Sequence, residues 1–199
     1  MNPYILLVLV ALLYTLVIGL LSTLRREGLS WQVAVEIVMA AAVLIGLSLA
    51  ANRPMQPVLL VALLYLVTMR ARLLVDLANL LARRGMVAPA TRLYRLALGL
   101  KPDPISRLIA QLNQGVHMLK QNQITQAISQ LQGLLPAFDT LSSPKYEAAV
   151  RYNLAVAYQR HGEDAKAVIE FNQVIDLMPG SLYSVGAQKA LDRGKRKDG

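Results

Sequence analysis

Two long apolar stretches open the chain. Residues 3–24 carry no charged side chain, and residues 31–51 carry only Glu36. At about 1.5 Å per residue, each stretch forms a helix of roughly 30 Å, the thickness of the hydrocarbon core of a bilayer. We expect both to span a membrane, with Trp31 at the interface. A cleaved signal peptide is disfavoured for residues 3–24, because no basic segment precedes them and no small-residue cleavage site follows.

The third apolar stretch, residues 55–69, is short for a membrane span. No helix breaker lies between Val58 and Arg84, so the pattern predicts one long helix whose first half lies in lipid. Its second half would begin the following region. Arg70 and Arg72 come directly after the apolar residues, and we expect them to contact lipid headgroups.

The basic residues predict how the chain crosses the membrane. Arg25, Arg26 and the dense basic run of residues 70–107 fall on the same side only if there are three spans, and basic loops favour the cytoplasm. We therefore expect an integral protein of a bacterial cytoplasmic membrane, with its N-terminus outside and its C-terminal region in the cytoplasm. Nucleic acid could also bind the basic run, but anionic lipid is the simpler partner.

From Arg70 onward, apolar residues recur at helical spacing. Breaks rich in Gly, Pro and polar residues separate segments of 12–18 residues, and no alternating strand pattern occurs. The predicted fold class is all-α: N-terminal transmembrane helices followed by a short α-solenoid.

One spacing of small and large residues occurs twice, 77 positions apart. Ala78 and Ala90 would let two helices approach closely, Tyr94 would fill the space between them, and Gly85 would end the first helix in the left-handed conformation. Pro102 would stop the second helix. The paired positions are Leu77 and Leu154, Ala78 and Ala155, Leu81 and Tyr158, Gly85 and Gly162, Ala90 and Ala167, Tyr94 and Phe171, Ala97 and Val174, and Pro102 and Pro179.

These residues resemble the tetratricopeptide repeat, a helix-turn-helix unit of 34 residues. The resemblance implies three repeats within residues 70–181. The middle repeat is weaker, with Gln114 where a Leu is expected, and Pro136 can end its second helix early. The expected organisation is a membrane region over 1–69, repeats over 71–104, 108–141 and 148–181, and a capping helix with a basic tail over 182–199.

The resemblance also implies a protein-binding groove lined by the first helix of each repeat. An amide side chain offers a donor and an acceptor together, so a row of Asn residues could pair with a peptide backbone of any sequence. The alternative is that these Asn side chains simply face water. Basic residues that would clamp a terminal carboxylate are largely missing. The candidate groove residues are Asn79, Arg83, Asn113, Lys120, Tyr152, Asn153 and Arg160.

Signatures of an enzyme are missing from the sequence. There is no cysteine, and His117 and His161 are the only histidines. No phosphate-binding loop or nucleophile motif occurs. We expect no catalytic residue, no metal and no cofactor. Glu36 is expected near the headgroups or turned toward another helix.

Three functions remain open from the sequence. The first is a membrane-anchored scaffold or adaptor that binds proteins during assembly of, or recruitment to, a membrane complex. The second is a permanent accessory subunit that packs through its spans, where small residues such as Ala42 and Gly46 permit close contact. The third is an enzyme or transporter with an unrecognised site. The expected partners are other proteins and the membrane, rather than nucleic acid or a small-molecule substrate.

Overall fold

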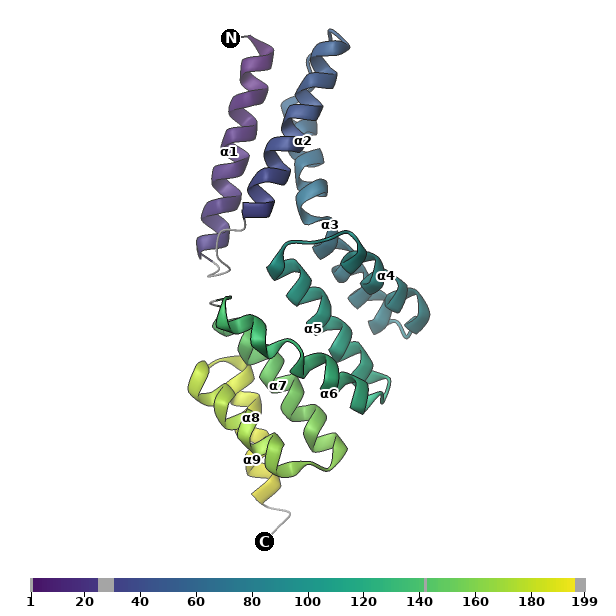
Figure 1. Ribbon diagram of the computed structural model, residues 1–199, viewed down its shortest axis with the longest axis vertical. Coiled ribbons are helices and arrows are strands. Elements are labelled where there is room, and N and C mark those ends of the chain that lie inside the picture. The colour runs from purple at the N-terminus through teal and green to yellow at the C-terminus, as the bar shows by residue number, and fades with distance from the viewer. Residues whose placement is uncertain (1, 25–30, 142, 196–199) are drawn as a thin grey trace.

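The computed structural model describes residues 2–24, 31–141 and 143–195, and this part of the chain contains helices and no strand. The first three helices form a bundle at one end of an elongated molecule, and the remaining helices form an array below it (Figure 1). The elements are α1 (Pro3–Leu24), α2 (Trp31–Ala50), α3 (Pro57–Arg83), α4 (Val87–Gly99), α5 (Pro104–Lys120), α6 (Ile124–Gln132), the 3-10 helix η1 (Leu135–Asp139), α7 (Pro144–His161), α8 (Asp164–Leu177) and α9 (Leu182–Lys195).

The bundle consists of α1, α2 and the first half of α3, and all three helices contact one another. They are long and apolar enough to cross a membrane. Leu7, Ile37 and Leu60 are buried between them, whereas most of their outward side chains are exposed and apolar. A buried polar contact joins α1 to α3, between the Tyr14 hydroxyl and Thr68 Oγ1 at 2.8 Å. An apolar outer surface of this kind suits lipid better than water.

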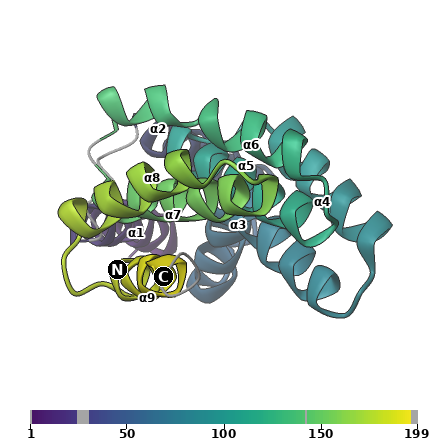
Figure 2. The same cartoon turned by 90° about the horizontal axis from the view of Figure 1, so that it is seen from below.

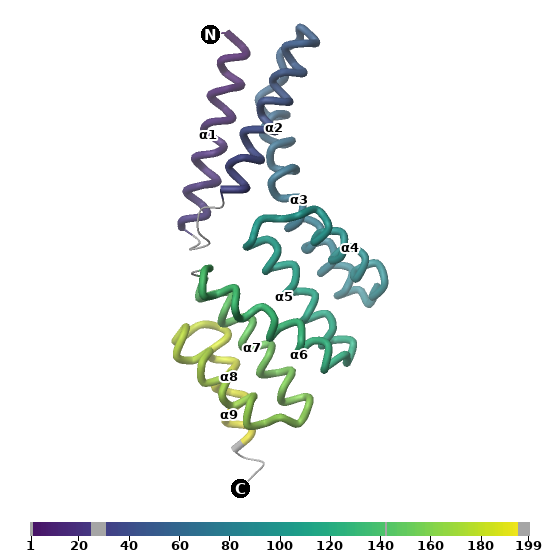
Figure 3. The backbone as a smooth tube through the Cα atoms, in the orientation of Figure 1, coloured from purple at the N-terminus to yellow at the C-terminus, as the bar shows by residue number. Residues whose placement is uncertain are grey.

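A single unbroken helix joins the bundle to the array. As the sequence predicted, α3 runs from Pro57 to Arg83 without interruption. Pro57 occupies the first turn, where a missing amide donor costs nothing. The tube view shows the continuous backbone passing from the bundle into the array (Figure 3). The N-terminal end of α2 and the C-terminal end of α1 lie at the same end of the bundle as the array. Arg25 and Arg26 lie outside the described residues.

The array has two layers of helices. The second half of α3 packs beside α5, α5 beside α7, and α7 beside α9; we call these four the first layer. The second layer consists of α4, α6 and α8, each of which lies between two consecutive first-layer helices. Seen from below, α4 lies at one side of the array and α9 toward the other (Figure 2). The order is that of stacked antiparallel helix pairs.

Small residues allow the paired helices to approach, as the repeated spacing predicted. Ala78 and Ala90 are fully buried with Tyr94 in the first pair, and Ala155 and Phe171 are buried in the third. Gly115 of α5 allows an equally close approach, because a Cβ there would stand 3.0 Å from Leu131 Cδ2. The core of the array is therefore a series of close helix crossings.

Two of the helix ends predicted for the array are confirmed, and one is wrong. Gly85 and Gly162 have φ values of 76° and 85°, the left-handed conformation that a glycine adopts at low cost. The Asp103 side chain accepts a hydrogen bond from the Ser106 amide at 3.1 Å and caps α5. Pro102 does not itself end α4, since the helix ends earlier, at Gly99, and Lys101 adopts a φ of 48°.

Two predicted helix lengths were wrong. The segments of the array were expected to have 12–18 residues, but α6 has nine and ends at Gln132. The chain then turns into η1, in which Pro136 occupies an early position, so the second helix of the middle pair does end early. The C-terminal helix was expected over residues 182–193, and α9 continues to Lys195. The rest of the basic tail, residues 196–199, lies outside the described residues.

Candidate functional site

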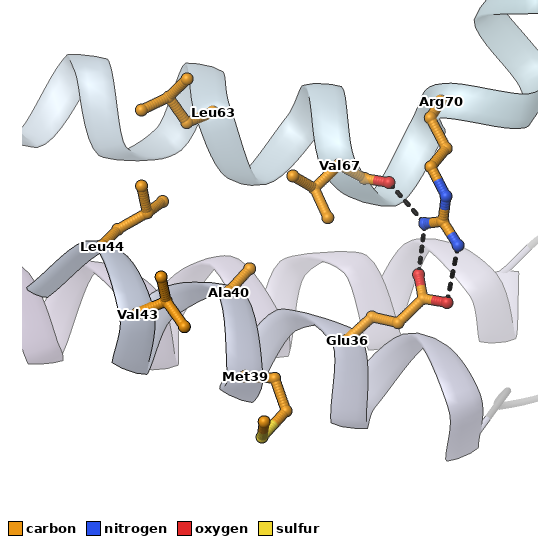
Figure 4. A pocket seen from close by; sticks show the side chains of 8 residues that line it. All are labelled: Glu36, Met39, Ala40, Val43, Leu44, Leu63, Val67 and Arg70. Carbon is orange, nitrogen blue, oxygen red and sulfur yellow. Dashed lines mark hydrogen bonds and ion pairs between the residues drawn. The ribbon is translucent and has the colours of Figure 1, made fainter. Parts of the chain in front are cut away.

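The bundle and the array meet at an ion pair between α2 and α3. Glu36 lies in the second turn of α2, and Arg70 lies where α3 leaves the bundle. The guanidinium of Arg70 donates to both oxygens of Glu36, at 2.5 and 2.8 Å (Figure 4). It also donates to the Val67 carbonyl at 2.6 Å and, more weakly, to the Leu100 carbonyl at 3.3 Å. A bidentate pair fixes both the distance and the rotation of the two helices.

A second contact ties the same junction to the loop between α4 and α5. Gln32 Nε2 donates to Glu36 Oε1 at 3.0 Å and to the Lys101 carbonyl at 2.8 Å. The first turns of α2 therefore hold both the end of the membrane-like segment of α3 and the turn that begins α5. This arrangement fixes the orientation of the array relative to the bundle.

Beside the ion pair lies an apolar pocket of about 470 Å³ on the outer surface of the bundle. The close-up shows Glu36 and Arg70 joined at one end of it and apolar side chains of α2 and α3 along its length (Figure 4). The apolar lining consists of Met39, Ala40, Val43, Leu44, Leu63 and Val67. The pocket thus combines an apolar floor with one paired acid and base.

Asn113 and Asn153 occupy equivalent places in the array. Asn113 Nδ2 donates to the Ile109 carbonyl at 2.8 Å, and Asn153 Nδ2 donates to the Ala149 carbonyl at 2.7 Å. Both side chains are partly exposed on first-layer helices, α5 and α7. Among the described residues, their Oδ1 atoms accept no hydrogen bond. Two amides therefore present the same oriented acceptor on neighbouring helices.

Asn79 differs from these two residues. Its Oδ1 accepts a hydrogen bond of 2.6 Å from the buried hydroxyl of Tyr94. Burial raises the pKa of Tyr94 to about 12, so this phenol remains a donor at physiological pH. The Asn79 side chain consequently holds α3 against α4. Its acceptor is already used, so only Asn113 and Asn153 remain of the expected row of amides.

Tyr152 lies under the C-terminal helix. Its ring contacts Phe171 and Tyr183 at centroid distances of 5.8 and 5.7 Å. A Cβ on Gly186 of α9 would come within 2.9 Å of the Tyr152 ring, so only a glycine allows this approach. Tyr152 therefore packs α7 against α8 and α9, a role that its place in the candidate groove did not anticipate.

The predicted basic residues divide into two kinds. Arg83, Lys120 and Arg160 are exposed at the C-terminal ends of first-layer helices, although Arg160 Nη1 also donates to the Leu119 carbonyl at 2.7 Å. Arg70 is bound to Glu36, and Arg72 Nε donates to Ser106 Oγ at 3.0 Å. Both arginines near the bundle therefore have protein partners, and their contact with lipid headgroups stays a prediction.

The buried histidine of the array has a structural role. His117 is buried between α4 and α5, beside the Tyr94 ring and the Thr91 hydroxyl, and burial lowers its pKa. Across residues 2–24, 31–141 and 143–195, no group of three His, Asp or Glu side chains could hold a metal ion. Glu36 was expected near the headgroups or turned toward another helix, and it does face α3, but sequence reasoning did not identify Arg70 as its partner. A charge inside an apolar stretch signals a partner, but the partner lies 34 positions away.

Comparison with known proteins finds nothing similar. No family model matches the chain, and neither a curated protein nor a solved structure resembles it significantly.

Proposed function

We propose that this protein is a membrane-anchored scaffold or adaptor of the tetratricopeptide type, which binds other proteins through the first layer of its helical array. The observation that carries the proposal is the matched pair of Asn113 and Asn153. Both amides are oriented by the same hydrogen bond to the carbonyl four residues earlier, and both leave an acceptor available. Amides held at equal steps along an array suit an extended peptide backbone.

The anchor adds a second element to the proposal. The three apolar helices insert in a bilayer, with the array on the cytoplasmic side, and the junction at Glu36 and Arg70 holds the array close to the membrane surface. Restriction to a surface raises the effective concentration of partners that lie in or near the same membrane. The proposed task is the assembly of a membrane complex or the recruitment of proteins to it.

A specific observation also supports the accessory-subunit alternative. Ala42 and Gly46 are exposed on α2, one turn apart, and a Cβ at Gly46 would meet no atom within 4 Å. Two small residues at this spacing on an outward face permit close packing of a partner's helix in the membrane. Under this alternative, the bundle rather than the array would hold the partner.

Affinity purification in mild detergent tests the proposal. The N113A/N153A double variant of the full chain should recover its protein partners about tenfold less well than the wild type, since two lost hydrogen bonds weaken binding by roughly 1–3 kcal/mol. A matched control is Q126A/N172A, which removes two exposed amide side chains from the second layer. Full recovery with N113A/N153A and loss with Gly46→Leu would instead support the accessory subunit.

A further inference from the structure

The pocket between α2 and α3 has the polarity of a site for one phospholipid. Its apolar lining lies on the outer face of the bundle, with Met39 and Val43 exposed to 61% and 56%. Its polar end is closed by Glu36 and Arg70, whose charges cancel (Figure 4). A lipid chain is the apolar group that a bilayer supplies at such a surface.

Distances along α2 place the polar end of the pocket near the lipid headgroups and its apolar lining in the hydrocarbon core. Trp31 is 81% exposed at the start of α2, where an indole lies among headgroups. Glu36 follows five residues later, about 7–8 Å along the helix, and the headgroup region of one leaflet is roughly 5–8 Å thick. The ion pair therefore lies at the border of the hydrocarbon core, and Val43 lies well inside it.

The loop held by Gln32 supplies a positive charge at headgroup level. Gln32 binds the Lys101 carbonyl, so the loop lies against the first turn of α2, and the Lys101 side chain is exposed. Asp103 is buried and caps α5, whereas Arg107 in the first turn of α5 is exposed. Lys101 and Arg107 are therefore exposed cations beside this loop, and positive charge at headgroup level suits an anionic phosphodiester.

We propose that this pocket binds one anionic phospholipid, with an acyl chain along Met39, Val43 and Val67 and the phosphodiester at Lys101. The bound lipid would fill the surface groove between α2 and α3 and connect the membrane to the loop before α5. The proposal rests on the membrane placement of the bundle, and it is independent of the partner bound by the array.

Native mass spectrometry of the full chain in non-ionic detergent, titrated with phosphatidylglycerol or phosphatidylethanolamine, tests this site. The wild type should retain one phosphatidylglycerol per chain, with about fivefold preference over phosphatidylethanolamine. Val43→Trp should fill the pocket and abolish retention, whereas Val38→Trp, also exposed on α2 but outside the pocket, should not. Lys101→Gln should remove the preference, whereas Arg84→Gln, directly after the far end of α3, should keep it.

Three results would overturn the proposal: equal retention of the two lipids by the wild type, equal retention by the two tryptophan variants, or a copurifying protein helix in the pocket. Both tryptophans replace exposed side chains, so the helices should remain intact. Circular dichroism of each variant checks this expectation. Capture of partners by the array should be unchanged in all four variants. Failure at this site is therefore distinguishable from failure of the scaffold function.

Discussion

Arg70→Glu should separate α2 from α3 and lower the midpoint of thermal unfolding in detergent by on the order of 10 °C. In the wild type, the Arg70 guanidinium donates two hydrogen bonds to Glu36 at the edge of the apolar bundle. The substitution removes both bonds and places two carboxylates side by side. Breaking a fully buried ion pair costs about 3–5 kcal/mol, and this partly exposed pair should lie at the lower end of that range. Each kcal/mol moves the midpoint of a chain of this size by roughly 2–4 °C.

The reversed pair is the informative control. Glu36→Arg in the Arg70→Glu background exchanges the two charges, and it should recover most of the lost stability. Arg84→Glu makes the same change at an exposed position directly after the end of the same helix, and it should leave the midpoint within about 1 °C. Equal midpoints for Arg70→Glu and Arg84→Glu would show that the pair contributes nothing to the junction.

Phe171→Ala should cost the last helix pair about 3–5 kcal/mol of stability, because its side chain is 1% exposed and removal leaves a cavity in the core. Phe171 also contacts the edge of Tyr152, so the loss should extend to α7 and α9. Hydrogen–deuterium exchange by mass spectrometry can follow α7, α8 and α9 separately from the bundle in the full chain.

The expected pattern is faster exchange in α7, α8 and α9, with the bundle helices unchanged. Ile169→Ala, on the same helix and 56% exposed, should leave exchange close to that of the wild type. Unchanged protection in Phe171→Ala would mean that the last pair is not held by this core. Faster exchange throughout the chain would instead mean that bundle and array unfold as one unit.

Local patterns predicted most of the helices because each depends on residues close in sequence. The long apolar runs marked α1 and α2, and the lack of a breaker after Val58 predicted the unbroken α3. Gly85 and Gly162 marked the ends of two helices, where the backbone adopts the left-handed conformation that favours glycine. The short α6 was harder to predict, since its apolar spacing continues beyond Gln132 although the helix does not.

Contacts between distant segments were not predictable from these patterns. The Glu36–Arg70 pair depends on the rotation of two helices about their axes, which the hydrophobic spacing of neither helix specifies. The carbonyl of Asn79 accepts a hydrogen bond from Tyr94, although the repeat pattern placed Asn79 on the same helix face as Asn113 and Asn153. Tyr152 is covered because Gly186, 34 positions later, allows α9 to approach it. The candidate groove therefore reduces to the two amides and the exposed basic residues near them.

Photocrosslinking in intact membranes can show whether the first layer of the array touches another protein. A photoreactive amino acid replaces Lys120, which is exposed at the end of α5, or Asn172, which is exposed on α8 in the second layer. Because both side chains are exposed, neither change disturbs the core. A scaffold that binds through its first layer gives a protein adduct of defined mass from position 120 and none from position 172. A third variant carries the photoreactive residue at Val38 in the bundle. Adducts from position 172 alone, or from position 38 but not from position 120, would contradict binding through the first layer.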